Sequence, residues 1–80
     1  MRFCAELLGN LGRSTGGEVC VELGGCVEVA EAVGRVLRAL GIPLDLEELL
    51  VTSERGEPLP AGATTCQVSR VRVVRLYKGG

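Results

Sequence analysis

Aromatic side chains are nearly missing from this sequence, which has one Phe, one Tyr and no Trp. Proteins that hold single-stranded nucleic acid combine stacking aromatic residues with a basic groove along the phosphates. A formal net charge of −1 argues against the second feature as well, so we expect no nucleic-acid partner. Because 46% of the residues are nevertheless hydrophobic, aliphatic side chains must build the core.

Histidine is absent altogether, and a zinc site would therefore depend on the four cysteines at positions 4, 20, 26 and 66. No two of them form a Cys-x-x-Cys pair, so such a site would require all four in one place. We therefore expect no metal ion and no bound cofactor. A redox or metal module built on these cysteines is the alternative, and metal bound to the purified protein would support it.

Long apolar runs are also absent, since none approaches the roughly 18 residues that a membrane-spanning helix needs. The opening segment 1–4 lacks the pattern of a signal peptide. We expect a cytoplasmic protein that is monomeric when alone and makes no contact with membranes. Its 80 residues suffice for one small core and leave little room for an enclosed active site. We therefore do not expect the chain to be an enzyme by itself.

Two runs of alternating residues predict an antiparallel hairpin at the start of the chain. Residues 1–8 form the first strand and Glu18–Leu23 the second, joined by the turn-rich segment 9–17. With the apolar faces aligned, Cys4 lies opposite Cys20 on the outer face. This register makes a Cys4–Cys20 disulfide geometrically feasible, and two free thiols that act as small apolar side chains are the alternative. Eight of the nine basic residues are Arg, which favours a heat-adapted source, where disulfides also occur inside cells.

Apolar residues that recur at spacings of three and four predict a helix over Val27–Leu40. Glu31 and Arg35 form a favourable pair four residues apart on its surface. Gly41 ends the helix. Cys26 stands where Ser, Thr or Asp would normally cap the first turn. A thiol at a helix N-terminus can be reactive, but no histidine is available to activate it, and an unreactive cysteine is the simpler interpretation.

The second half of the chain predicts a short strand pair and a final strand. Leu49–Thr52 begins a third strand, which turns at Glu54–Glu57 and returns briefly through Leu59. Pro58 confines this return to a sheet edge or a loop, because proline has no N–H to donate. After a loop, Val68–Leu76 forms the last strand.

The order strand, strand, helix, strand, strand (ββαββ) predicts an α+β domain in which one helix packs on one face of a mixed sheet of four to five strands. For a right-handed crossover, we expect the strand after the helix beside the first hairpin. The last strand should lie in the middle, next to the first. Residues 1–76 form this domain, and residues 77–80 form a flexible tail anchored by the central strand.

The sequence stops at Gly79-Gly80, and the terminal carboxylate is our candidate reactive group. Two residues without side chains can enter a narrow cleft and leave the terminal carbonyl open to a nucleophile. The alternative is an incidental floppy end, because termini are usually disordered unless they are tied down.

The last strand also carries apolar residues on its polar face. Arg72 points away from the core, and by alternation Val74 and Leu76 point the same way. Apolar side chains on a nominally wet face indicate a contact surface for a partner, and a local twist or bulge is the alternative. The candidate docking residues are Arg72, Val74, Leu76, Tyr77 and Lys78.

In the order and spacing of its motifs, the chain resembles the ubiquitin-like β-grasp family. It is most similar to the sulfur carriers, which comprise the small subunit of molybdopterin synthase and the thiamine-pathway carrier, and to the small archaeal modifier proteins related to them. The resemblance covers nearly the whole chain. The matching motifs are Glu6-Leu7-Leu8-Gly9, residues 27–32, Leu50-Val51 with residues 56–60, and residues 70–73 followed by Gly79-Gly80.

The resemblance implies a carrier rather than an enzyme. A partner activating enzyme would use ATP to turn the Gly80 carboxylate into an acyl-adenylate. A sulfur donor would then leave a thiocarboxylate for cofactor synthesis of the molybdopterin or thiamine type, with a large synthase subunit as a further partner, or for tRNA thiolation.

Two other functions stay open. The stretch Arg75–Lys78 is similar to the tail of ubiquitin, which fits a protein modifier that is joined through Gly80 to lysines of target proteins. In the third interpretation, the chain is a non-catalytic β-grasp interaction domain whose Gly-Gly ending is incidental.

Overall fold

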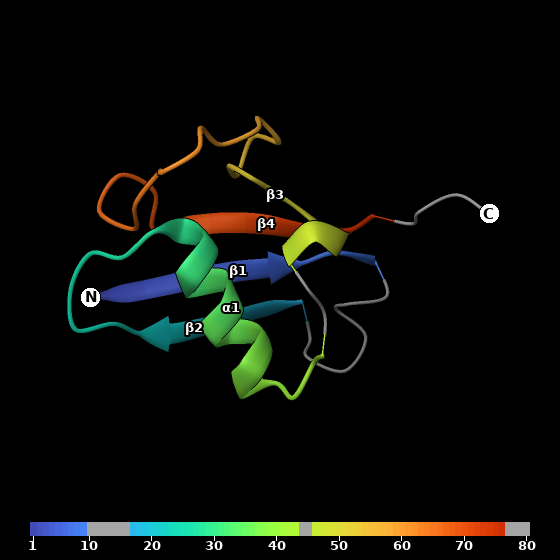
Figure 1. Ribbon diagram of the computed structural model, residues 1–80, viewed down its shortest axis with the longest axis horizontal. Coiled ribbons are helices and arrows are strands. Elements are labelled where there is room, and N and C mark those ends of the chain that lie inside the picture. The colour runs from blue at the N-terminus through green and yellow to red at the C-terminus, as the bar shows by residue number, and fades with distance from the viewer. Residues whose placement is uncertain (10–16, 44–45, 77–80) are drawn as a thin grey trace.

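The computed structural model describes residues 1–9, 17–43 and 46–76 (Figure 1). This part of the chain is α+β, with one α-helix and a four-stranded mixed sheet, as the sequence predicts. The elements are β1 (Arg2–Leu7), β2 (Glu18–Glu22), α1 (Val29–Ala39), the 3-10 helix η2 (Leu46–Glu48), β3 (Leu49–Thr52) and β4 (Arg70–Arg75). Within the described ranges, no helix is long and apolar enough to cross a membrane.

The strand order in the sheet is β2-β1-β4-β3. β4 lies in the middle and runs parallel to β1, as predicted, while β3 pairs antiparallel with β4. The expectation that the strand after the helix lies beside the hairpin is wrong. β4 occupies the free edge of β1, so β3 takes the outer position (Figure 1).

The predicted return strand after β3 is reduced to an isolated bridge between Thr52 and Pro58. One further backbone bond supports it, from the Ser53 N–H to the Glu57 carbonyl oxygen at 2.9 Å. Pro58 has no N–H with which to continue a ladder. Of the four to five strands expected, the described sheet therefore contains four.

The β1–β2 hairpin has the predicted register, with Cys4 directly opposite Cys20. At the end of the hairpin, three residue pairs before Cys4–Cys20, Met1 and Leu23 exchange two backbone hydrogen bonds, of 2.8 and 2.7 Å. Because hydrogen-bonded and non-hydrogen-bonded pairs alternate along an antiparallel ladder, Cys4 and Cys20 form a non-hydrogen-bonded pair. Side chains of such a pair lie closest together across the strands.

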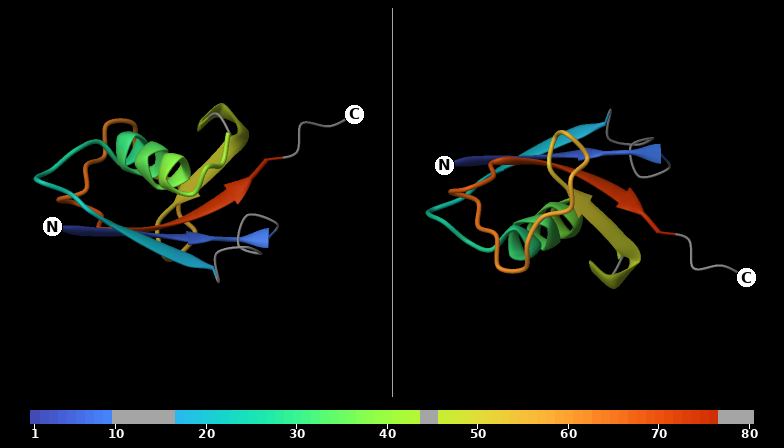
Figure 2. Two further views of the ribbon diagram at one scale, coloured as in Figure 1. Left: turned by 90° about the horizontal axis from the view of Figure 1, so that it is seen from below. Right: turned by 90° about the horizontal axis from the view of Figure 1, so that it is seen from above.

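α1 covers one face of the sheet, and the core lies between them (Figure 2). Aliphatic side chains fill this core around the single phenylalanine, as the composition predicts. Each fully buried Val or Phe stabilises the fold by about 1.5–3 kcal/mol. The largest fully buried side chains are Phe3, Val33, Val36, Val71, Val73 and Thr65.

α1 begins at Val29, two residues later than predicted, because its first turn is capped from elsewhere in the chain. Glu28 is the N-cap but makes no side-chain cap bond. Instead, the Val29 N–H donates to the Ala63 carbonyl oxygen at 2.9 Å. At the other end the prediction is confirmed, since Gly41 has a φ of +70° and closes the helix in the left-handed conformation.

Candidate functional site

The face of the sheet opposite α1 is free of helices among the described residues (Figure 2). Successive side chains of a strand point to opposite faces of the sheet. Because Val71 and Val73 are buried in the core on the α1 side, the residues that alternate with them point to the open face. The register then aligns Glu6 with Arg72 and Leu50 with Val74 on this open face. Candidate functional residues from β1, β2, β3 and β4 thus share one surface.

An apolar patch made of Leu50, Val74 and Leu76 lies at the C-terminal end of β4 on the open face. Leu50 and Val74 are directly paired, and the Leu76 N–H donates to the Glu48 carbonyl oxygen at 2.7 Å, which extends the ladder by one pair. Leu50 is 42% and Leu76 45% exposed. β4 pairs regularly with β3 from Arg72 to Arg75, so a bulge does not account for the apolar residues on this face.

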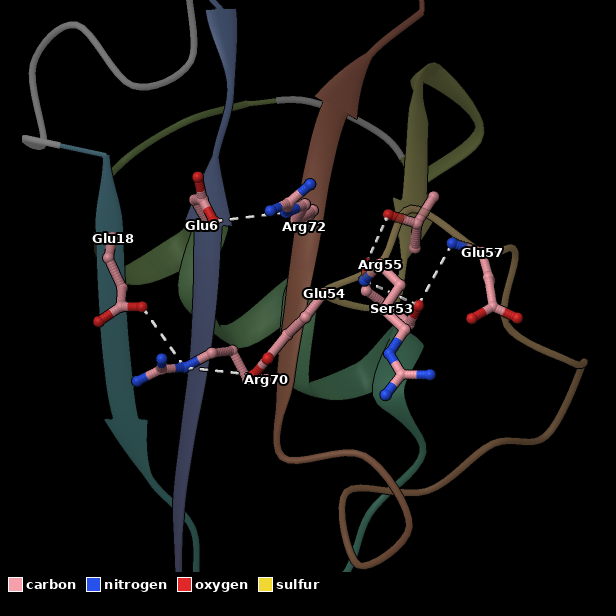
Figure 3. Close-up of polar contacts among 9 residues, drawn as sticks. Glu6, Glu18, Ser53, Glu54, Arg55, Glu57, Arg70 and Arg72 are labelled. Carbon is pink, nitrogen blue, oxygen red and sulfur yellow. Dashed lines mark hydrogen bonds and ion pairs between the residues drawn. The ribbon is translucent and has the colours of Figure 1, made fainter.

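Ion pairs of the β4 arginines with glutamates lie on the same open face (Figure 3). The Arg72 Nε atom lies 3.5 Å from a Glu6 carboxylate oxygen, and the Arg70 Nε atom lies 3.5 Å from Glu18 and 3.8 Å from Glu54. Arg70 reaches from β4 across β1 to Glu18 on β2. Because all these side chains are at least 42% exposed, each pair contributes little stability, about 0–1 kcal/mol.

Of the sequence-predicted site residues, Arg72, Val74 and Leu76 therefore lie together on the open face. Tyr77, Lys78, Gly79 and Gly80 lie outside the described residues. The reactive role of the terminal carboxylate and the docking role of the tail stay predictions.

All four cysteines are paired. The Cys4–Cys20 disulfide that the hairpin register makes feasible is present, with Cα atoms 4.0 Å apart. The second disulfide, Cys26–Cys66, joins residues 40 positions apart, with Cα atoms 5.4 Å apart. The sequence does not predict this pairing, and the simpler interpretation of Cys26 from the sequence is an unreactive cysteine at the start of the helix. Local pattern carries no signal for this pair, because only the complete topology brings the loop before α1 against the loop before β4.

A small cavity of about 240 Å³ lies between the start of α1, β3 and the loop before Ala63. Its lining is mostly apolar, with Glu28 among the lining residues. A second, open hollow of about 380 Å³ is polar and lies between the Ser53–Glu57 turn and the start of β4. Neither hollow includes a residue of the apolar patch or a cysteine.

No protein-family model, no curated protein and no solved structure matches this chain. The function proposed below is therefore inferred from the sheet topology and from the residues of the open face.

Proposed function

We propose that this chain is a ubiquitin-like β-grasp sulfur carrier whose C-terminal residue is Gly80 and whose terminal carboxylate is activated by a partner enzyme. One observation carries the proposal. The central strand β4 is hydrogen-bonded on both sides and runs out beside an exposed apolar patch, with Leu76 as the last described residue. The four residues up to Gly80 follow directly from this rigid base.

The topology supports the β-grasp part of the proposal. A hairpin, one helix on one face and a last strand inserted parallel to the first are compatible with a β-grasp sheet. Such a sheet gives the tail a base that cannot fray from an edge, because β4 has a neighbour on each side.

The proposed chemistry starts with attack of the Gly80 carboxylate on the α-phosphorus of ATP. A carboxylate-oxygen-to-phosphorus bond forms and pyrophosphate leaves, which gives a mixed anhydride. A sulfur donor at the oxidation level of hydrosulfide then attacks the carbonyl carbon, a C–S bond forms and AMP leaves. Activation is needed because a carboxylate resists nucleophiles, whereas AMP is a good leaving group. The product is a thiocarboxylate on this chain.

This chain would supply the carboxylate and the docking surface, and the partner would bind ATP. The apolar patch lies next to the root of the tail, so a partner that covers Leu50, Val74 and Leu76 would hold the tail in its own active site. Arg72 borders the patch and could pair with a carboxylate of the partner in place of Glu6. Because ATP is cytoplasmic, the proposal includes a cytoplasmic location, where disulfides are common in heat-adapted organisms.

The test combines the full chain, an adenylating enzyme from the same genome, ATP and a sulfur donor. We expect a mass gain equal to the difference between sulfur and oxygen, located on the C-terminal peptide, and ATP-dependent AMP release. The matched control is the chain without Gly79 and Gly80, which should keep its fold and gain no sulfur. Absence of any ATP-dependent adduct with the activating enzymes of that genome would refute the proposal.

A protein modifier is the second candidate function. One observation favours a modifier whose copies are not linked to one another into polymers. The Met1 amino group donates to the Leu23 carbonyl oxygen at 2.8 Å, and the sequence has a single lysine, Lys78, beside its own tail. The domain thus offers a donor carboxylate and poor acceptor amines. Isopeptide-linked products on other proteins, instead of a thiocarboxylate, would select this function.

A further inference from the structure

We propose that, once the Cys4–Cys20 disulfide is reduced, Cys4, Cys20 and Glu18 bind a divalent cation of the Zn²⁺ type on the open face. The Sγ atoms of both cysteines and a carboxylate oxygen of Glu18 all lie within 4.8 Å of one another. This inference is independent of the proposed carrier function. It revises the sequence expectation of no metal site, which assumed that all four cysteines would be needed.

The backbone holds the three ligands in position. Cys4 and Cys20 are a non-hydrogen-bonded pair of the β1–β2 ladder, so their side chains leave the sheet next to each other. Glu18 precedes Cys20 by two residues on β2 and therefore projects from the same face. A site built on two paired strands is more rigid than one on a loop.

In the structure the two Sγ atoms are joined in the disulfide, so after reduction the side chains must rotate apart to take the spacing of zinc ligands. Zinc binds thiolate sulfur at about 2.3 Å and carboxylate oxygen at about 2.0–2.2 Å. Two thiolates in a tetrahedral site are then about 3.8 Å apart, which two cysteines can reach from Cα atoms 4.0 Å apart. Cys4 is buried and Cys20 half-buried, while Glu18 is exposed. The fourth position therefore opens outward, to water or to a ligand from a partner.

Arg70 balances the charge of this site. Two thiolates, one carboxylate and a divalent cation sum to one negative charge, and the Arg70 Nε atom lies 3.5 Å from one Glu18 carboxylate oxygen. Arg70 can hold that oxygen while the other binds the metal, as outer-shell groups do in zinc sites. It also keeps a second carboxylate partner, Glu54, at 3.8 Å.

Metal binding would depend on the redox state of the hairpin. A dithiol reductant supplies two electrons, so the Cys4–Cys20 S–S bond breaks, two thiols form and the reductant becomes a disulfide. Binding of the cation then releases the two thiol protons, because thiolates are the ligands. The oxidised chain has no thiolate to offer, so it should not bind.

The test uses Co²⁺ as a spectroscopic probe and Zn²⁺ as its competitor, added to the full chain after anaerobic reduction. We expect one Co²⁺ per chain with the visible bands of a tetrahedral thiolate site, displaced by Zn²⁺. Cys26→Ser/Cys66→Ser should retain these bands, whereas Cys4→Ser/Cys20→Ser and the oxidised chain should lack them. Glu18→Gln and Arg70→Ala should each weaken binding about tenfold or more.

Thermal unfolding of the same reduced chains shows whether the site belongs to the folded state. Free Zn²⁺ at a hundred times its Kd should raise Tm by roughly 10–20 °C, or refold a reduced chain that has unfolded, and only where Cys4 and Cys20 are present. Three results would overturn the proposal: no tetrahedral Co²⁺ spectrum, an unchanged Kd in Glu18→Gln, or a Tm that Zn²⁺ lowers because it binds the unfolded chain.

Discussion

Replacing Cys26 and Cys66 by serine should destabilise the domain more than replacing Cys4 and Cys20. The Cys26–Cys66 disulfide joins residues 40 positions apart, whereas the Cys4–Cys20 disulfide joins residues 16 positions apart. Opening the longer loop returns more conformational entropy to the unfolded chain, about 4 kcal/mol against about 3 kcal/mol. A domain of this size has a total free energy of unfolding of about 4–12 kcal/mol, so either loss is a large fraction of it.

Calorimetry on the two double-serine variants measures this difference. We expect Tm to fall by roughly 15–30 °C without Cys26–Cys66 and by roughly 12–25 °C without Cys4–Cys20. Both variants should still fold. In the variant without Cys26–Cys66, two hydrogen bonds beside the lost disulfide should still hold the loop before α1 against the loop before β4. The Thr65 N–H donates to the Val27 carbonyl oxygen at 2.8 Å, and the Val27 N–H donates to Thr65 Oγ1 at 3.1 Å.

A dithiol reductant provides the control, because it should lower the Tm of the unaltered chain and leave a chain without cysteines unchanged. A fall of only a few degrees in both variants would refute the reasoning, since the loops would then be held closed by other contacts in the unfolded state. A larger fall for the Cys4–Cys20 pair would also refute it and would point to native-state packing around the hairpin.

Three further predictions concern the patch, the tail and a helix end. Leu50→Glu should leave Tm nearly unchanged but lower the kcat/KM of adenylation by about 30-fold, since a docking hot spot contributes about 2 kcal/mol. The matched control is Arg38→Glu on the exposed face of α1, which should leave this kcat/KM unchanged. Removing Gly79 and Gly80 should abolish transfer while the circular dichroism spectrum stays the same. Gly41→Ala should lower the free energy of unfolding, measured by chemical denaturation, by about 1–2 kcal/mol, because the φ of Gly41 is +70°. Its control, Gly34→Ala, lies inside α1 with open space around it and should raise this free energy by about 0.5–1 kcal/mol.

The hairpin and the end of the helix were predictable because local rules decide both. Strict alternation fixes which side chains share a face, and it therefore predicted that Cys4 would meet Cys20. At the helix end, Ile42 and Gly41 donate backbone bonds to Leu37 and Arg38, a closure that the glycine signals in the sequence.

The features that were missed depend on parts of the chain far apart in sequence. The helix starts later than expected because the Ala63 carbonyl caps Val29, a partner that no local rule identifies. The Cys26–Cys66 bridge and the outer place of β3 follow from the complete sheet order. The closeness of the Glu18 carboxylate to both sulfur atoms likewise follows only from the paired strands.

Under the proposed carrier function, the open face would let the chain bind a partner and then leave it. α1 buries Phe3, Val71 and Val73 completely on the other side of the sheet, so the core does not need the apolar patch to be covered. A patch centred on Leu50, Val74 and Leu76 offers a few hot spots among solvated ion pairs, whereas permanent complexes bury larger and more apolar surfaces. Carrier chemistry requires such weak contacts, because one face would meet the activating enzyme first and the sulfur acceptor later. The two partners should therefore compete for this chain, and a stable complex holding both at once would contradict a shared docking face.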